Sequence, residues 1–274
     1  MTQLDFEEIA YAKINLALHV RRRREDGYHE LETLFAFVDQ GDRLHFTDGY
    51  PENLKVIGEF ASEVGPLENN LALHALSLDQ GRFSLLVELD KRLPVAAGLG
   101  GGSADAAAVI RALYRFRGTK HSIKKEWIAE LGADVPACVH SQTCIGRGTG
   151  TDLESIDNDL AGTPVLLLNP RVPLSTGPVF KSWDGIDRGA MPQGSARAVA
   201  LGGRNDLEAP AVALCPVIAD VLAALAQTGA WLCRMSGSGA TCFALYDSEA
   251  ELAAAAQGIA TQHPGWWQLT GKLR

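Results

Sequence analysis

Apolar and polar residues alternate over residues 9–20, near the start of the chain. One face of an extended segment carries the apolar residues Ala12, Ile14, Leu16, Leu18 and Val20. The opposite face carries Lys13 and Asn15, two positions apart. Because side chains alternate across a strand, the pattern predicts a strand on which Lys13 and Asn15 emerge together. A buried lysine ammonium needs a partner, so the pair indicates either a polar site or an edge strand with one solvated face.

Three further segments of the first half have the pattern of strands: Leu31–Val38, Arg43–Thr47 and Arg82–Leu89. The residues Asp39-Gln40-Gly41-Asp42 separate the first two of these segments. Asp and Gly favour turns, so we expect a hairpin that turns at residues 39–42.

A cluster of glycines, Gly98-Leu99-Gly100-Gly101-Gly102, leads into an alanine-rich segment. This segment predicts a helix from about Ala104 to Phe116, with Ser103 at its N-cap. Glycine lets the backbone approach an anion, and the first helical N–H groups form a phosphate site with the helix dipole. The sequence therefore predicts a phosphate-binding loop, and a flexible loop before an ordinary N-cap is the alternative.

The glycine loop differs from two common nucleotide-binding motifs. It is not a Walker A motif, because no Lys-Ser or Lys-Thr pair follows the last glycine. It is not a Rossmann turn, because Ser103 stands at the third glycine position of GxGxxG.

The second half contains a continuous apolar run, Thr163–Leu168, which predicts a buried strand. Trp231–Met235 and Thr241–Tyr246 are predicted strands on either side of the sequence Ser236-Gly237-Ser238-Gly239-Ala240. Residues 184–204 have no clear period, so we expect a loop there. Strands and helices mix without strict alternation, which predicts an α+β fold with antiparallel pairing, in two halves that divide near residues 150–162.

Three other segments carry candidate chemistry. Asp134, in Gly132-Ala133-Asp134-Val135-Pro136, follows a helix predicted from Ser122 and is either a turn residue or a general base. Tyr28 and His29 follow Gly27 in a turn. Such a pair can bind a nucleobase, with the tyrosine stacked on the base and the histidine hydrogen-bonded to its edge. The alternative is that Tyr28 is a core residue and His29 a surface residue. Residues 236–240 form either a loose hairpin or a loop that brings backbone near a ligand.

Composition narrows the class of protein. The 274 residues are 46% hydrophobic, the net charge is −8, and the N-terminal segment has neither a signal-peptide nor a transit-peptide pattern. An acidic protein of this kind lacks the overall positive charge with which proteins bind nucleic acid. We expect the run Arg21–Arg24 to be a solvated loop rather than a phosphate-binding patch. Five cysteines without a CxxC pair fit reduced thiols in the cytoplasm, and no apolar run is long enough to cross a membrane. Cys138, His140 and Cys144 lack the fourth ligand and paired spacing of a zinc site, so we expect no protein metal centre.

Taken together, these motifs resemble the GHMP kinase family. The family carries a lysine or its equivalent in the first strand, a proline-led glycine and serine loop that opens a helix, and a late glycine-rich hairpin. Here these features resemble Ala12-Lys13-Ile14-Asn15, Pro94–Ala104 and Met235–Ala240. Ala104 stands where many members have a second serine.

Two further stretches resemble the branch of this family that phosphorylates 4-diphosphocytidyl-2-C-methyl-D-erythritol. They are Arg24-Glu25-Asp26-Gly27-Tyr28-His29-Glu30-Leu31 and Gly132–Pro136, and the similarity continues into Gly203-Arg204-Asn205-Asp206-Leu207-Glu208. The resemblance implies a domain like the second domain of ribosomal protein S5 at residues 1–158. It implies a ferredoxin-like α/β domain at residues 159–274. The reaction would transfer phosphate from ATP to the 2-hydroxyl of that substrate, with Mg²⁺, in the non-mevalonate isoprenoid pathway.

The resemblance also implies roles for individual residues. Lys13 and Asp134 would be catalytic, with Asp134 as the base. The ATP phosphates would be bound by Pro94, Val95, Ala96, Ala97, Gly98, Leu99, Gly100, Gly101, Gly102, Ser103 and Ala104. The substrate would be bound by Asn15, Tyr28, His29, Thr176 and Phe180, with Tyr28 and Phe180 on either side of the cytosine. The third glycine-rich motif would be Ser236, Gly237, Ser238 and Gly239.

Two alternatives stay open at this point. A homoserine or mevalonate kinase of the same family would keep the ATP loop and would not need Tyr28 and His29. An RNA-binding module without enzymatic activity is suggested by the S5-like topology alone, and the acidic net charge argues against it.

Overall fold

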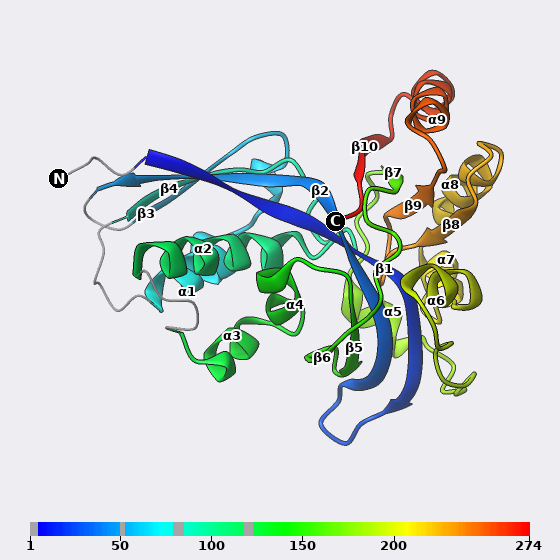
Figure 1. The fold of residues 1–274 in the computed structure, drawn as a ribbon, viewed down its shortest axis with the longest axis horizontal. Coiled ribbons are helices and arrows are strands. Elements are labelled where there is room, and N and C mark those ends of the chain that lie inside the picture. Colours follow the sequence, from blue (N-terminus) through cyan, green and yellow to red (C-terminus); the bar gives the residue numbers. More distant parts are fainter. Residues whose placement is uncertain (1–4, 50–52, 79–84, 118–122) are drawn as a thin grey trace. The chain divides into compact units, whose positions relative to one another are not determined.

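The computed structural model describes residues 5–49, 53–78, 85–117 and 123–274 (Figure 1). The chain folds into two compact units that are interleaved along the sequence. Unit 1 takes its described residues from 1–12, 41–95 and 100–140, and unit 2 takes them from 13–40, 96–99 and 141–274. Because neither unit is one continuous stretch, the boundary predicted at residue 158 divides the sequence only and stays a prediction.

Unit 1 contains β3 (Asn53–Ile57), β4 (Leu85–Asp90), the second half of β2 (His29–Asp48) and the start of β1 (Asp5–Arg23), up to Ala12. β4 pairs antiparallel with β2 and parallel with β3. The long first strand β1 (Asp5–Arg23) pairs with β2, and the prediction of a strand at residues 9–20 is confirmed. Residues 82–84 of the strand predicted before the glycine loop lie outside the described residues.

The hairpin predicted at residues 39–42 is wrong, because β2 continues through this segment without a turn. The polar side chains find partners in other segments instead. The Asp39 carboxylate accepts the Lys272 N–H at 2.8 Å, and the buried Asp42 carboxylate accepts the Leu93 N–H at 2.8 Å. At Gly41 a Cβ atom would lie 1.9 Å from the Ala10 carbonyl oxygen, so glycine is needed here for the close approach of β1.

The helices of unit 1 are α1 (Leu71–Ser77), α2 (Gly101–Arg117), α3 (Lys125–Leu131) and α4 (Val135–His140), with single 3₁₀ turns at Ala61–Glu63 and Leu67–Asn69. α2 packs against α1 and α4, and Figure 1 shows these helices on one side of the strands of this unit. Ala106, Ala107 and Ala108 are completely buried. Their small side chains favour the helix and let its neighbours come close.

The N-cap predicted at Ser103 is wrong, because α2 begins two residues earlier, at Gly101. The Ala104 N–H donates to the Gly100 carbonyl at 2.8 Å, so the last glycines belong to the first helical turn. Ser103 therefore lies inside that turn. The helix that we predicted from Ser122 begins at Lys125 in the structure, and Ser122 lies outside the described residues.

Unit 2 contains a four-stranded antiparallel sheet in the order β10–β7–β9–β8. The strands are β7 (Pro164–Asn169), β8 (Leu232–Met235), β9 (Cys242–Leu245) and β10 (Trp267–Lys272). If the four strands are numbered along the chain, their order across the sheet is fourth, first, third, second. Helices follow the first and the third of these strands, as in a ferredoxin-like domain. The strands predicted at 163–168, 231–235 and 241–246 are confirmed.

The helices of unit 2 are α5 (Thr176–Lys181), α6 (Ala196–Gly202), α7 (Glu208–Leu214), α8 (Val217–Ala226) and α9 (Glu249–Gln262). α8 packs on β8 and β9, and α9 packs on β7 and β10. Leu166, Leu168, Val221 and Ile259 are buried together in the resulting core. The same unit contains β5 (Cys144–Gly148) and β6 (Asp152–Ser155), with β5 paired to the first half of β2.

The loop predicted for residues 184–204 is only partly correct, because α6 occupies Ala196–Gly202. The Ser195 hydroxyl accepts the Ala198 N–H at 3.4 Å as an N-cap. This short helix buries Val199 and Ala200. A helix of seven residues is too short for its apolar period to stand out in the sequence.

Candidate functional site

The glycine loop has one part in each compact unit. In unit 1, Gly100 directly precedes the 17-residue helix α2, and Gly101–Ser103 belong to the first turn of that helix. Gly98 and Gly100 have positive φ angles of 76° and 62°, which glycine adopts without strain. The exposed Gly102 and the half-buried Ser103 lie at the amino-terminal end of the helix, whose first N–H groups have no helical partner. Pro94 and Ala104 are buried, so their side chains serve packing.

Asp134 lies next to the same region of unit 1. It directly precedes α4, and its carbonyl accepts the Cys138 N–H at 3.0 Å. A Cβ atom on Gly132 would lie 3.8 Å from the Ser103 hydroxyl oxygen. The structure thus brings the segment Gly132–Asp134 close to the start of α2, although the two are distant in sequence.

Lys13 and Asn15 emerge on the same face of β1, as predicted. Both are buried in unit 2, with 4% and 3% of their surface exposed. The Lys13 ammonium donates to the Asn15 side-chain oxygen at 2.9 Å, and Asn15 Nδ2 donates to the Thr33 hydroxyl at 2.7 Å. Thr33 in turn donates to the Ala17 carbonyl. Asn15 is therefore held in a single orientation, and Thr33 is a member of this site that the sequence did not indicate.

The third glycine-rich motif packs against the first part of the glycine loop in unit 2. The Ser236 hydroxyl donates to the Gly98 carbonyl at 2.8 Å and accepts the Asn15 N–H at 3.2 Å. A Cβ atom on Gly98 would lie 2.3 Å from the Ser236 carbonyl oxygen. The Lys13 N–H donates to the Leu99 carbonyl at 2.9 Å. Three of the predicted motifs thus meet at residues 96–99, where Ala96 is exposed and Ala97 and Leu99 are buried.

Two residues position the loop at 236–239 from outside it. The Asn205 amide donates to the carbonyls of Met235 and Gly237, both at 2.8 Å. The Ser238 hydroxyl shares a hydrogen bond of 2.9 Å with Thr176 at the start of α5. Asn205 lies in a segment that the sequence singled out without a role, and the structure supplies that role.

His29 lies against two aromatic rings of unit 2. Its ring centroid is 5.0 Å from that of Phe180 and 5.8 Å from that of Trp183. The Nε2 atom of His29 is buried and has no hydrogen-bond partner among the described residues. Burial, followed by the positive charge of Arg23, lowers the pKa of the imidazole below its ordinary value, so the ring is neutral at pH 7.

Tyr28 is 64% exposed, so the alternative that it is a core residue is excluded. Trp183 is a buried neighbour of His29 that the sequence did not single out. Arg23 donates to the carbonyls of Lys181 and Trp183 at the end of α5 and lies over the Trp183 ring. The turn before His29 is therefore tied to the helix that carries Phe180.

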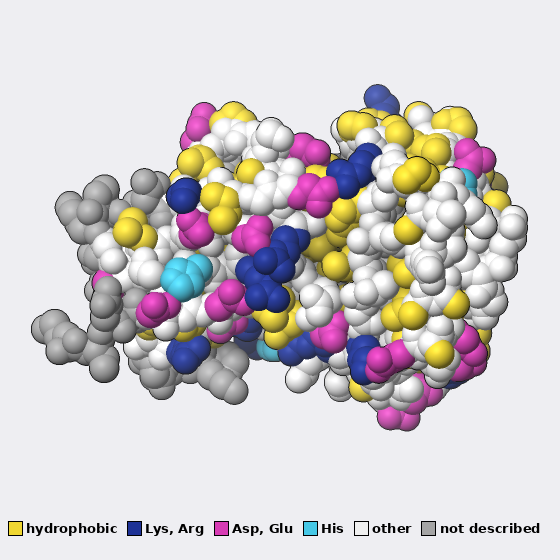
Figure 2. Space-filling model, turned by 90° about the horizontal axis from the view of Figure 1, so that it is seen from above, with side chains coloured by type: hydrophobic (Ala, Val, Ile, Leu, Met, Phe, Trp, Pro, Cys, Tyr) yellow, Lys and Arg dark blue, Asp and Glu magenta, His cyan; other side chains and the backbone are white. Residues whose placement is uncertain are grey.

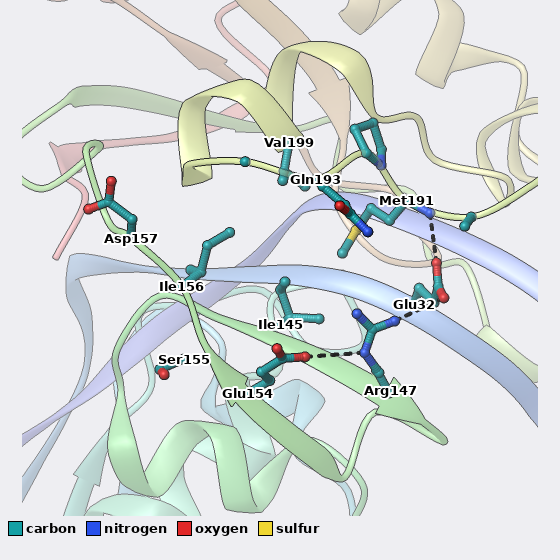
Figure 3. Close-up of a pocket in the computed structure, with 13 residues that line it drawn as sticks. Glu32, Ile145, Arg147, Glu154, Ser155, Ile156, Asp157, Met191, Gln193 and Val199 are labelled. Atoms are coloured by element: carbon teal, nitrogen blue, oxygen red, sulfur yellow. Dashed lines mark hydrogen bonds and ion pairs between the residues drawn. The ribbon is translucent and has the colours of Figure 1, made fainter.

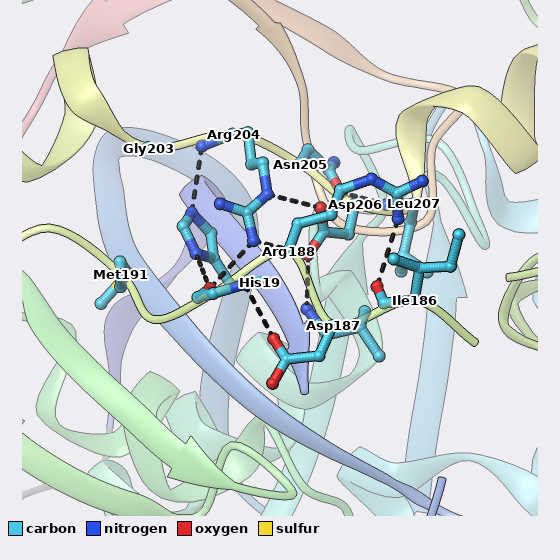
Figure 4. A network of polar contacts seen from close by, with 12 residues as sticks. His19, Ile186, Asp187, Arg188, Met191, Gly203, Arg204, Asn205, Asp206 and Leu207 are labelled. Carbon is cyan, nitrogen blue, oxygen red and sulfur yellow. Dashed lines mark hydrogen bonds and ion pairs between the residues drawn. The ribbon is translucent and has the colours of Figure 1, made fainter. Parts of the chain in front are cut away.

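A second polar network surrounds the buried His19 (Figure 4). His19 Nε2 accepts the Arg204 N–H at 3.2 Å, so Nδ1 carries the proton and donates to the Gly189 carbonyl at 3.1 Å. Arg204 also donates to Gly189 and to the Asp206 carboxylate. Burial is the main reason that the pKa of His19 is lowered. The network connects β1 with residue 189 and with Gly203–Asp206.

Residues 190–194 line a pocket of about 420 Å³ in unit 2 (Figure 3). Arg147 spans one side of it and pairs with Glu32 at 2.9 Å and Glu154 at 3.3 Å. Met191, Ile145 and Val199 supply apolar surface. None of the site residues predicted from the sequence lines this pocket.

Basic side chains are largely paired with acidic ones. The run Arg21–Arg24 was predicted to be a solvated loop, which is wrong for its first three residues because β1 extends to Arg23. Arg21 pairs with Glu32 and Asp187, and Arg24 pairs with Asp26 and Glu30. On the face that Figure 2 shows, dark-blue and magenta side chains lie next to one another. The described residues on this face form no broad basic area of the kind that binds nucleic acid.

The structure also addresses metal centres and membrane spans. Within residues 5–49, 53–78, 85–117 and 123–274, no three His, Cys, Asp or Glu side chains are grouped so that they could hold a metal ion. In the same part of the chain, no helix has both the length and the apolar character needed to cross a membrane.

Comparison with known proteins identifies the family. Residues 68–148 match the family model "GHMP kinases N terminal domain", and residues 192–264 match "GHMP kinases C terminal". The chain belongs to the GHMP kinase family. It is thus an ATP-dependent small-molecule kinase, and the predicted two-domain fold of this family is confirmed.

Two relatives that match this GHMP kinase over nearly their whole length carry the same name. The chain is 59% identical to 4-diphosphocytidyl-2-C-methyl-D-erythritol kinase of Novosphingobium aromaticivorans, over 99% of this chain and 94% of that protein. It is 57% identical to the kinase of the same name from Erythrobacter litoralis, over 97% and 99%.

Solved structures agree with this grouping. A crystal structure of 4-(cytidine 5′-diphospho)-2C-methyl-D-erythritol kinase matches with a TM-score of 0.82 and 33% identity, over 98% of this chain and 99% of that chain. Mevalonate kinase of L. major matches with a TM-score of 0.68 at 15% identity, over 99% and 97%. The second likeness shows a shared fold alone.

Proposed function

We propose that this kinase transfers the γ-phosphoryl group of ATP to the 2-hydroxyl of 4-diphosphocytidyl-2-C-methyl-D-erythritol, a step of the non-mevalonate isoprenoid pathway. The observation that carries the proposal is the contact of the His29 ring with Phe180, together with a buried His29 Nε2 that has no hydrogen-bond partner among the described residues. The names of the full-length relatives support the same substrate.

The loop Pro94–Ala104 is proposed to bind the ATP phosphates. The start of α2 presents unpaired N–H groups and the positive end of the helix dipole. Glycines at 100–102 let an anion approach the backbone closely. These features fit a triphosphate, and the Ser103 hydroxyl adds a donor at the same place.

Lys13 and Asp134 are proposed to act on the substrate hydroxyl. Asp134 would accept its proton as the oxygen attacks the γ-phosphorus, and ADP would leave with the bridging oxygen. Lys13 would hold the hydroxyl and balance negative charge, with its ammonium oriented by Asn15. Positioning and charge stabilisation supply most of the rate in phosphoryl transfer.

Tyr28, His29 and Phe180 are proposed to bind the cytosine. A base that stacks between the exposed Tyr28 ring and Phe180 would place its edge toward His29. The neutral imidazole can bond that edge through Nε2. Asn15 and Thr176 would line the polar part of the pocket, and Ser238 fixes the Thr176 hydroxyl.

Mg²⁺ is proposed as the second cofactor. It would neutralise charge on the transferred group. Magnesium in such sites is held by one or two carboxylates together with substrate phosphates, so a cluster of three protein ligands is not required. A cytoplasmic location is proposed from the five cysteines, because none of them forms a disulfide bond with another described residue. Because the net charge is acidic, the protein is also proposed not to bind nucleic acid.

The test is ADP release by the purified protein with ATP and Mg²⁺ against the cytidine substrate, homoserine and mevalonate. We expect kcat/KM to be highest for the cytidine substrate by at least about 100-fold, because a site built to bond a group discriminates strongly against compounds that lack it. A higher kcat/KM for homoserine or mevalonate would overturn the proposal. If the protein phosphorylates none of these compounds and instead retains mixed RNA in a filter-binding assay, the RNA-binding alternative is favoured.

A further inference from the structure

Three residues with ionisable side chains form a buried cluster in unit 1, outside the residues assigned above. Lys91 follows β4, Asp42 lies in β2 and Asp105 lies in α2, and none has more than 3% of its surface exposed. The Lys91 ammonium donates to Asp105 Oδ2 at 2.9 Å and to Asp42 Oδ2. Buried ions are costly, and a single polar cluster inside a packed core needs a reason beyond stability.

The cluster fixes the chain on both sides of the glycine loop. The second carboxylate oxygen of Asp42 accepts the N–H groups of Arg92 and Leu93, at 2.6 and 2.8 Å, directly before Pro94. Asp105 lies in the first turns of α2, directly after the loop. Lys91 joins these two carboxylates. The entry and the exit of the loop are therefore held by one cation.

Lys91 also lies directly beneath the start of α2. A Cβ atom on Gly101 would be 3.0 Å from the Lys91 ammonium nitrogen and 3.7 Å from Asp42 Oδ2. A Cβ atom on Gly102 would meet only Leu71, at 3.9 Å. The glycine at 101 thus makes room for the buried ammonium as well as for an anion outside.

The charge state of the cluster suits this position. Burial, reinforced by the Asp42 carboxylate and opposed by Lys91, raises the pKa of Asp105 to about 8. Asp105 is then protonated at neutral pH, and Lys91 and Asp42 cancel one another. A neutral cluster beneath the helix end does not repel phosphate groups, whereas a second buried carboxylate would.

We propose that Lys91, Asp42 and Asp105 are positioning residues, which hold the amino-terminal end of α2 and the adjoining glycine loop in the conformation that receives the phosphate groups of ATP. This inference rests on the proposed role of the loop Pro94–Ala104 in ATP binding. It assigns to the three residues no contact with either substrate.

The test compares three variants of the full-length protein. Asp105→Ala removes one acceptor of Lys91 and leaves the Lys91–Asp42 pair, so no charge loses its partner. Asp105→Asn keeps an acceptor oxygen in the same place. Arg111→Met is the matched control, because Arg111 lies further along α2 and donates to the carbonyls of Ile9 and Cys138.

Asp105→Ala is expected to raise the KM for ATP about five- to tenfold, the effect of one lost buried hydrogen bond, and to leave the KM for the cytidine substrate unchanged. Asp105→Asn should restore the KM for ATP at pH 7. Arg111→Met should lower Tm and leave both KM values unchanged. An Asp105→Ala protein with a cooperative melt and wild-type KM for ATP, or with both KM values raised equally, would overturn the inference.

Calorimetry with a non-hydrolysable ATP analogue separates this inference from the proposed function, since it needs no alcohol substrate. If the wild-type protein binds the analogue and phosphorylates none of the alcohols tested, the proposed substrate fails and the positioning role is still measured. If Asp105→Ala does not fold, Asp105→Ser carries the test, because its shorter side chain withdraws the acceptor from the Lys91 ammonium. Its affinity for the analogue should fall below that of Asp105→Asn, and equal affinities of these two variants overturn the inference.

Discussion

The Ser236 hydroxyl donates a hydrogen bond to the Gly98 carbonyl at 2.8 Å, although 138 positions separate the two residues in the chain. The same oxygen accepts the N–H of Asn15. One buried side chain therefore joins the late glycine-rich hairpin to the glycine loop and to the first strand. Ser236 in the hairpin therefore helps to hold the glycine loop in place. This role does not depend on a direct contact between the hairpin and a ligand.

Ser236→Ala should lower stability and weaken ATP binding together. The change leaves the Gly98 carbonyl and the Asn15 N–H without this partner, at a cost of about 1–3 kcal/mol. Melting curves and the KM for ATP measure the two effects. Ser248→Ala is the control, since Ser248 caps α9 by accepting the Glu251 N–H and costs about 1 kcal/mol when removed. If both variants lower Tm and neither changes the KM for ATP, Ser236 has a structural role only.

Lys13→Met and Asp134→Asn should each reduce kcat by about 10²–10⁴-fold or more, as expected when a general base or its partner group is lost. Asp134→Asn should keep a cooperative melt, because asparagine has nearly the same size and shape as aspartate and can still accept a hydrogen bond through its side-chain oxygen. Steady-state assays at saturating ATP give kcat. Near wild-type turnover by Asp134→Asn would rule out Asp134 as the base.

Tyr28→Ala should raise the KM for the cytidine substrate by roughly 5- to 150-fold, since stacking on an aromatic ring contributes about 1–3 kcal/mol per base. Its Tm should not fall, because the ring is largely exposed. His29→Ala should act on the same KM by removing the bond to the base edge. The KM for ATP serves as the internal control. Equal effects on both substrates would contradict a cytosine pocket at these residues.

The free energy of unfolding should decrease as the pH is lowered below about 6.5, and part of this decrease should depend on His19. Its pKa is lowered from 6.5 in the folded protein, so the unfolded chain binds a proton first. The stabilising contribution is present above pH 6.5 and is lost as the pH falls through the lower folded value. Tm measured against pH should decline less steeply for His19→Gln. Parallel curves for the two proteins would show that His19 does not titrate with unfolding.

The KM for ATP should rise as the pH increases from 7 to 9. Asp105 loses its proton with a pKa of about 8, and Lys91 remains charged because the two carboxylates outweigh the effect of its burial on its pKa. The added negative charge costs about 1 kcal/mol at a partly screened distance, or about fivefold in affinity. Asp105→Asn should show a flat profile. A rise of equal size in that variant would assign the effect to another group.

The pattern of apolar and polar residues correctly predicted strands in which one or both faces are buried. The alternation around Lys13 and Asn15 and the apolar run at 163–168 both gave strands that the structure contains. Residues 39–42 were predicted wrongly, since Asp39 and Asp42 find their partners more than 50 positions away. Ser103 was predicted as a cap because the sequence does not show that Gly101 and Gly102 take helical angles.

The candidate site was predicted from family motifs more than from local pattern. Trp183, Thr33 and Asn205 were missed because their roles arise from contacts with distant residues: His29, Asn15 and the carbonyl of Gly237. The Lys91 cluster was missed for the same reason, since a lysine before a glycine loop is an ordinary surface residue until its two carboxylates are placed.

The most direct measurement of the central claim is ³¹P NMR of the reaction of the wild-type protein with ATP, Mg²⁺ and 4-diphosphocytidyl-2-C-methyl-D-erythritol. We predict one new phosphomonoester signal that grows in step with ADP, with the diphosphate signals of the cytidine substrate still present, and proton shifts that place the new phosphate on the 2-hydroxyl. A phosphomonoester at a different hydroxyl, or ADP formation without any new ester, would contradict the account.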